Sequence, residues 1–268
     1  GITVGSRLVL AVRPMAIVGG HLNYFGVQAT GPIECRAAVR QVIKEGADFI
    51  KITATGGSTR TSFPLRPSFN PEEINAICDE AHKFGKHTVA HCTSSQGMVN
   101  ALDAGVDTIV HAGFKESDGT YKFRPEIAER MASQGVFVNP TFQVGHSRVW
   151  ALEKKVELGE SLTEEEQERL DSYNKIYEDK LDSFARMRDL GVTMVCGSDS
   201  SWGNYQMGQF QIEIEAHARA GMSPMEAIVS ATRLSAGSLW LDDEIGTIEP
   251  GKKADLLVVD GDPARKVE

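Results

Sequence analysis

The chain has 268 residues, a formal net charge of −9 and 41% hydrophobic residues. This length suits an α/β barrel, and the hydrophobic content supports a sizeable core, which argues against a disordered chain. The negative charge disfavours nucleic acid, which needs a basic surface, and no apolar stretch approaches the roughly 20 residues of a membrane span.

The cellular compartment is predicted from two features. The start of the chain lacks the basic-then-apolar pattern of a signal sequence. The chain has four cysteines, Cys35, Cys78, Cys92 and Cys196, and no two of them are spaced closely as in a C-x-x-C motif. We therefore expect reduced thiols in a cytoplasmic protein.

Short apolar runs alternate with helical patterns along most of the chain. Strands are predicted at residues 7–12, 47–53, 87–91, 107–111, 136–140 and 192–197. Helices are predicted at residues 32–45, 71–83, 95–104 and 125–134. The same order of elements occurs five times: a helix, then a glycine, then one or two residues, then an apolar strand. This repetition predicts parallel strands joined by helical crossovers.

The stretch from about 148 to 190 breaks this alternation. It is rich in Glu, Lys and Leu, and Thr163 with Glu166 fits a capping box, so two helices are expected there as an insertion. Their charges suit a solvated surface, and a lid over a site is the alternative. A further helix is expected from Pro224 to Gly237, and residues 245–260 predict a turn followed by a short strand outside the barrel.

Four polar residues each end an apolar run: Lys51, His91, His111 and Asp199. The carboxyl ends of parallel barrel strands meet at one mouth, so we expect these side chains to converge there. Imidazole nitrogen and carboxylate oxygen suit zinc or a similar divalent ion. A lysine cannot ligate as an ammonium, but burial favours the neutral amine, which can add carbon dioxide and become an anionic carbamate.

Ordinary structural roles are the alternative for each of these four residues. A lysine that ends a strand is commonly a solvated flank, and a histidine there is commonly a hydrogen-bonded structural residue. Asp199 could cap a helix. The metal hypothesis depends on all four residues following separate strands.

Several segments resemble the amidohydrolase superfamily of metal-dependent hydrolases, in particular its branch of Xaa-Pro dipeptidase-like, arginine-carboxypeptidase-like and imidazolonepropionase-like members. The matching segments are 46–51 with 54–57, the strand that ends at His91, 104–111, 197–199 and 245–256. The Pro-Gly-Lys-x-Ala-Asp-Leu pattern that begins at Pro250 is among the more specific of them. The resemblance implies a TIM-like (β/α)8 barrel over residues 1–244. It also implies that residues 245–268 are the C-terminal β segment of a small β-sandwich domain.

The resemblance also implies a hydrolase of C–N bonds in amides or peptide-like small molecules, acting through a metal-activated hydroxide. Lys51 would be the carboxylated bridging ligand, and His91 and His111 would bind the second of one or two ions, zinc being expected. Asp199 would bind the first ion and act as general base. His21 and Tyr24, which follow the first strand found, are candidate substrate-binding residues.

The family's His-x-His pair is not found in this sequence. The run at 7–12 resembles the third strand of the family, so about six barrel strands are expected where closure needs eight. We therefore expect a missing N-terminal segment or a companion chain to complete the barrel. The open sheet edge also makes a homo-oligomer plausible.

Other functions remain compatible with the sequence. An inactive fragment or a binding module of the same fold would explain the missing ligands. A deaminase-like or phosphotriesterase-like hydrolase could use the same metal site, because a fold does not fix the substrate.

Overall fold

The computed structural model describes residues 5–147, 149–200 and 208–267. The chain forms two compact units, Gly1–Val136 and Phe137–Glu268. Within the described ranges, no helix combines the length and the hydropathy that crossing a membrane requires. All four cysteines are free, as the sequence predicted, and all four are buried.

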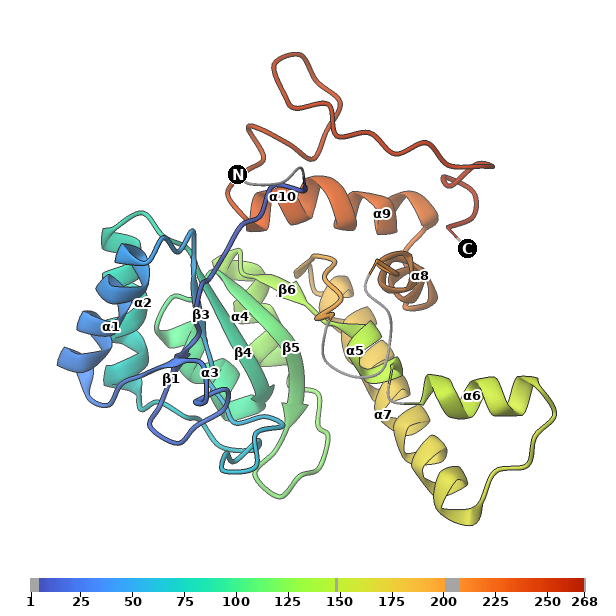
Figure 1. Cartoon of the computed structure of the whole chain (residues 1–268), viewed down its shortest axis with the longest axis horizontal. Helices are drawn as coiled ribbons and strands as arrows, with labels where there is room; N and C mark the ends of the chain where they lie inside the picture. Colours follow the sequence, from blue (N-terminus) through green and yellow to red (C-terminus); the bar gives the residue numbers. More distant parts are fainter. Residues whose placement is uncertain (1–4, 148, 201–207, 268) are drawn as a thin grey trace. The chain divides into compact units, whose positions relative to one another are not determined.

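The first unit is built on short parallel strands (Figure 1). They run in the order β2-β1-β3-β4-β5. Their bounds are β1 Met15–Ala16, β2 Val27–Gln28, β3 Ile50–Ile52, β4 Thr88–Ser94 and β5 Thr108–Lys115. The parallel pairing is set by contacts such as Ile50 opposite Thr88 and Val89 opposite Thr108, so the predicted crossover arrangement is confirmed here.

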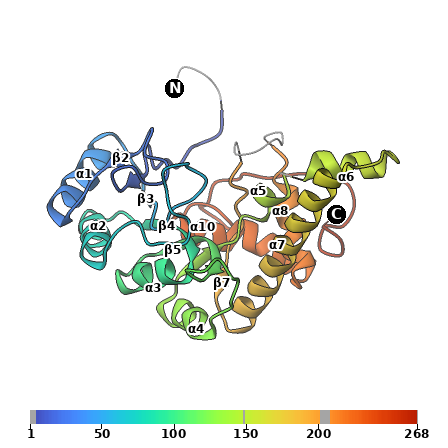
Figure 2. The same cartoon turned by 90° about the horizontal axis from the view of Figure 1, so that it is seen from below.

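Four helices lie on one side of these strands (Figure 2). They are α1 Pro32–Lys44, α2 Pro71–Lys83, α3 Ser95–Asp103 and α4 Pro125–Gln134, close to the predicted ranges. Three begin with proline at the first helical position, where its missing N–H costs no hydrogen bond. In α2 the Asn70 side chain accepts from the Glu73 backbone N–H while Glu73 accepts from the Asn70 N–H, which closes a capping box.

The strand predicted at residues 7–12 is wrong. These residues form no strand, and Leu8 and Leu10 expose 70% and 46% of their surface. The strand beside β3 is β1 instead, whose Met15 lies opposite Ile52 and is fully buried. Alternating hydrophobicity identifies runs that can form strands, but the ladder partner decides which of two neighbouring runs does so.

The second unit contains the parallel pair β6 Phe137–Asn139 and β7 Thr193–Met194. Its helices are α5 Phe142–His146, α6 Trp150–Glu157, α7 Glu164–Asp189, α8 Gln211–Arg219, α9 Pro224–Val229 and α10 Ser235–Ser238. A π-helical turn, Ser230–Leu234, joins α9 to α10. The predicted helix from Pro224 to Gly237 is therefore present as three consecutive segments.

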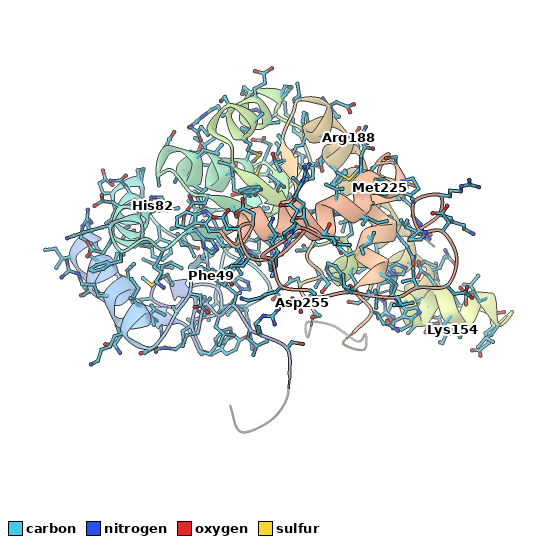
Figure 3. All side chains as sticks on the ribbon, turned by 90° about the horizontal axis from the view of Figure 1, so that it is seen from above. Phe49, His82, Lys154, Arg188, Met225 and Asp255 are labelled. Carbon is cyan, nitrogen blue, oxygen red and sulfur yellow. The ribbon has the colours of Figure 1, made fainter. Side chains whose placement is uncertain are left out.

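Helices α6 and α7 are the two helices predicted between residues 148 and 190. The capping box of Thr163 and Glu166 begins α7 as expected. Val149, Leu152 and Leu170 form a small hydrophobic cluster between the two helices. At the end of α7, Arg188 (labelled in Figure 3) donates to the Ala220 carbonyl at 3.3 Å, which fastens the long helix to the end of α8.

Residues 245–267 contain no strand, so the predicted short strand is not formed here. Leu257 and Val258 expose 86% and 94% of their surface and form no ladder with any described residue. A strand exists only with a hydrogen-bonding partner, and an apolar run without one stays extended and solvated. The assignment of this segment to a small β-sandwich domain remains a prediction.

Candidate functional site

Lys51 and His91 lie on the same face of the sheet in the first unit. Lys51 is the middle residue of β3 and pairs with Val89 of β4. His91 comes two residues after Val89, and side chains two apart on a strand point to the same face. The positive charge of Lys51 also acts on the His91 ring, which is 8% exposed. Both strands continue past these residues, so the structure brings Lys51 and His91 together from within neighbouring strands and not from the predicted strand ends.

His111 joins them because its backbone departs from strand geometry. In the β4–β5 ladder His111 pairs with Cys92, which follows His91 and would face the other way. At His111, however, φ is +76°, in the left-handed region that costs a non-glycine residue about 1–3 kcal/mol. The His111 ring lies 4.5 Å from the His91 ring at an interplanar angle of 77°. The left-handed backbone at His111 therefore accompanies a ring contact with His91 that regular strand geometry would disfavour.

His21 adds a third ring to this group. It follows β1 and is 6% exposed, and its ring centroid lies 4.6 Å from that of His91. Its Nδ1 lies 2.9 Å from the Thr59 hydroxyl in the segment after β3. We call His21, His91 and His111 the imidazole cluster.

The rings of His21 and His91 are held neutral. Burial, followed by the charge of Lys51, lowers the pKa of His21 to about 4 and that of His91 to about 3. The Nε2 of His91 lies 3.0 Å from the Gly56 carbonyl oxygen. A carbonyl only accepts, so Nε2 carries the proton and Nδ1 carries the lone pair of the neutral ring. His91 can therefore offer Nδ1 to a cation without first losing a proton.

Tyr24 differs from the buried histidines. It exposes 63% of its surface, and its ring packs edge-on against Phe25 at 5.0 Å. Its role in substrate binding remains a prediction.

Asp199 belongs to the second unit, in the segment that follows β7. Its φ of +51° is again left-handed, a conformation that Asp and Asn tolerate better than most residues. Its negative charge acts on the buried carboxyl of Glu213 in α8 and favours the protonated form of Glu213. Asp199 therefore lies in a charged environment that the strand pattern alone did not reveal.

Glu213 and Lys180 hold the turn between β6 and α5. The two Glu213 oxygens accept from the Phe142 and Gln143 backbone N–H groups at 2.8 and 2.7 Å. The Lys180 ammonium donates to the Pro140 and Thr141 carbonyls at 3.1 and 3.2 Å. Neither residue could be predicted from the sequence, because each acts on backbone groups about 40 or 70 positions away.

His217, one turn after Glu213 in α8, is fully buried. Ser230 donates to the Ala227 carbonyl at 2.7 Å, so its oxygen accepts from His217 Nδ1 at 3.0 Å. Burial lowers the pKa of His217 to about 3, and its Nε2 lies 4.0 Å from Glu213 Oε1. The spacing Glu-x-x-x-His on an amphipathic helix was the signal that could have indicated this buried pair.

Because the Glu213 carboxyl is buried, we expect the stability difference between the parent and a Glu213→Gln variant to depend on pH. Burial is the main cause that raises its pKa from 4.5 to about 7. Between pH 4.5 and pH 7, Glu213 keeps its proton in the folded state but loses it in the unfolded state. The stability that Glu213 contributes is therefore fully present below pH 4.5 and is lost as pH rises through 7. Glu213→Gln has no such loss. We expect the variant to gain on the order of 1–3 kcal/mol relative to the parent between pH 4.5 and 8.

Urea unfolding of both proteins at several pH values in the presence of a chelator measures this gain. The amide also perturbs one of the two backbone contacts, but that cost does not depend on pH, so only the slope of the difference is used. Glu215→Gln, two residues further along α8, is the matched control for the loss of one acidic group. Parallel stability curves for the parent and Glu213→Gln would show that Glu213 is charged in the folded state.

Within the described ranges, no three residues of the His, Cys, Asp and Glu types are grouped so that they could hold a metal ion. Lys51 lies beside the imidazole cluster and is not of these types. A metal held by the first unit would therefore need Lys51 in a ligating form or further ligands.

The parallel strands with helical crossovers define an α/β protein, and comparison with known sequences names the family. The sequence profile described as "Amidohydrolase family" matches residues 2–268. The chain therefore belongs to the amidohydrolase family, as its motifs predicted.

The structure resembles that of a Xaa-Pro dipeptidase with methionine bound in its active site, with a TM-score of 0.80 and 30% identity. The match covers 98% of this chain and 64% of that chain. Ochratoxinase of Aspergillus niger is 28% identical over 274 residues, which is 100% of this chain and 51% of the relative. Imidazolonepropionase of Thermoplasma volcanium is 36% identical over 74 residues, 28% of this chain and 18% of the relative.

The chain thus spans about half of the ochratoxinase sequence and less than two thirds of the dipeptidase structure. Together with the parallel strands and their helices, the match confirms the predicted TIM-like amidohydrolase fold, of which this chain represents part.

Proposed function

We propose that this chain carries a large part of the active site of a metal-dependent hydrolase that cleaves C–N bonds in amides or peptide-like small molecules. The family and the similarity to a dipeptidase and an ochratoxinase support the class of bond. The observation that carries the metal proposal is the imidazole cluster beside Lys51. There, His91 is held neutral with Nδ1 as its lone-pair nitrogen.

The chemical types of these side chains suit a divalent ion, with zinc as the expected one. Two imidazoles, a carboxylate and an anionic lysine carbamate match the nitrogen and oxygen ligands that zinc accepts. We assign this role to His91, His111, Asp199 and Lys51, the last as its carbamate. A bound divalent ion would supply an acidified water and polarise the carbonyl group under attack.

The other steps fall to side chains of this chain. Asp199 accepts the proton of the attacking water and delivers it to the leaving nitrogen as general base and then general acid. The neutral ring of His21 binds an oxygen of the substrate. Its burial strengthens that hydrogen bond, because the surroundings are less polar than water.

We further propose that the family's His-x-His pair, which this sequence lacks, comes from another segment of the intact protein or from a companion chain. Zinc binding and turnover are therefore expected of the intact protein.

The test combines a metal count with a substrate panel. The protein is loaded with zinc, dialysed and analysed for bound metal, then assayed with N-acyl amino acids, dipeptides that end in proline, a cytosine-type amidine and a phosphotriester. We expect bound zinc and hydrolysis of amides or dipeptides. His91→Asn with His111→Asn should lose zinc, whereas His82→Asn, a histidine paired with Asp107 on the surface of α2, should retain it. Undiminished zinc in the double variant would refute the assignment of the metal ligands, and turnover of the amidine or phosphotriester alone would refute the assignment of the bond.

A further inference from the structure

The segment after β3 is tied to the segment after β1 by two threonines. The Thr59 hydroxyl lies 2.9 Å from His21 Nδ1 and 3.0 Å from the Leu22 backbone nitrogen. Two residues later, the Thr61 hydroxyl donates to the Gly19 carbonyl at 2.8 Å and lies 3.3 Å from the Asn23 side-chain nitrogen. Both threonines thus join the two segments, but of the two hydroxyls only that of Thr59 bonds to the His21 ring.

The His21 ring is also confined on its other sides. Its centroid lies 4.6 Å from that of His91. A Cβ atom on Gly57 would come within 2.5 Å of His21 Nε2 and within 2.7 Å of the two adjoining ring carbons. A half-turn of the ring would exchange Nδ1 with a carbon atom and break its bond to Thr59. Packing therefore fixes the plane of the ring, and Thr59 selects which edge faces the loop.

We propose that Thr59 is a positioning residue that holds His21 as the Nε2–H tautomer, so that His21 donates a hydrogen bond to a carbonyl or carboxylate oxygen of the substrate. The Leu22 N–H can only donate, so the Thr59 oxygen accepts from it. Among the described residues, the other hydrogen-bonding neighbour of the Thr59 hydroxyl is His21 Nδ1, so we assign the hydroxyl proton to that contact, with Nδ1 as the acceptor. In a neutral imidazole the remaining nitrogen, Nε2, carries the proton.

The consequence for function rests on the proposed hydrolase activity. Amide and peptide substrates present oxygen acceptors, and a fixed donor discriminates between them and substrates that lack such an oxygen, because an unpaired buried polar group is costly. Thr59 would then act on substrate binding through His21 without touching the substrate itself.

The first test does not depend on hydrolysis. Long-range proton–nitrogen NMR of protein labelled with 15N-histidine reports the tautomer of each imidazole, and a His21→Gln variant assigns the His21 signals. We expect the Nε2–H tautomer in the parent and in Thr59→Ser, which keeps the hydroxyl. Thr59→Val should give a mixture of tautomers. Thr61→Val removes the neighbouring threonine of the same segment and should leave the His21 signals unchanged.

The second test is kinetic. In the intact enzyme, Thr59→Val should raise KM by about 3- to 10-fold with a smaller change in kcat, in keeping with one weakened neutral hydrogen bond. Thr59→Ser should restore the parent KM. An Nδ1–H tautomer in the parent, or a His21 spectrum that Thr59→Val leaves unaltered, would overturn the positioning role. Absence of any hydrolysis with the expected tautomer in place would refute the proposed function and leave the role of Thr59 standing.

Discussion

Replacing Asp199 with asparagine is expected to lower kcat by about 10²- to 10⁴-fold, the usual contribution of general acid–base catalysis. The amide has the size of the carboxylate but cannot accept the proton of the attacking water. Asparagine is preferred to alanine because φ at this position is +51°, and asparagine tolerates the left-handed region at least as well as aspartate. The loss of rate then reports chemistry rather than backbone strain.

The measurement is a steady-state assay at saturating zinc over a range of pH, with metal content determined on the same samples. Asp242→Asn, an exposed aspartate of the same unit, is the matched control and should retain parental turnover. A kcat for Asp199→Asn within a few-fold of the parent, with zinc bound, would remove Asp199 from the role of general base.

Lys51→Arg is expected to reduce zinc binding strongly and to lower activity by at least about 10²-fold. Loss of groups that only orient metal ligands already costs 10- to 100-fold, and here a ligand itself is removed. Arginine keeps the positive charge beside His91 but cannot form a carbamate, because its guanidinium does not deprotonate in proteins. The substitution therefore separates the electrostatic effect of Lys51 from its proposed ligand role.

Two readouts distinguish these roles. With 13C-bicarbonate, the parent should show a carbamate carbon signal that Lys51→Arg lacks. Lys51→Met removes the charge that helps to lower the pKa of His21 and His91, so both imidazoles of the metal-free protein should titrate at higher pH than in the parent. Lys122→Arg, in the segment between β5 and α4, controls for a general effect of the substitution. Parental zinc content and turnover in Lys51→Arg would show that Lys51 is not a ligand.

The sequence could predict those parts of the fold that depend on short-range patterns. The helices were predictable from prolines and capping boxes, such as Thr163 with Glu166, because a helix satisfies its backbone groups within one segment. Strand predictions were less secure, since a strand depends on a partner elsewhere. The exposed run at residues 7–12 and the unpaired apolar tail near Val258 show the same failure for the same reason.

The candidate site divides in the same way. The apolar runs before Lys51 and His91 indicated the strands that carry them, and the ladder register places both residues on one face. The sequence predicted that His111 and His91 lie close together but not how they do so, because ordinary alternation turns His111 away and a left-handed φ accompanies the observed ring contact. Glu213 had no sequence signal that linked it to the turn after β6, since its partners are the backbone N–H groups of distant residues.

The sequence by itself determined the family and the alternation of parallel strands with helices, because both depend on local motifs and on hydrophobic periodicity. Tertiary structure decided which rings touch, which of them are neutral and which threonine faces His21. These properties depend on burial and on contacts between segments about 20 to 70 residues apart, as for His91 with His111 and Glu213 with Phe142. Desolvation and hydrogen-bond geometry, which set protonation states, arise only when the chain has folded.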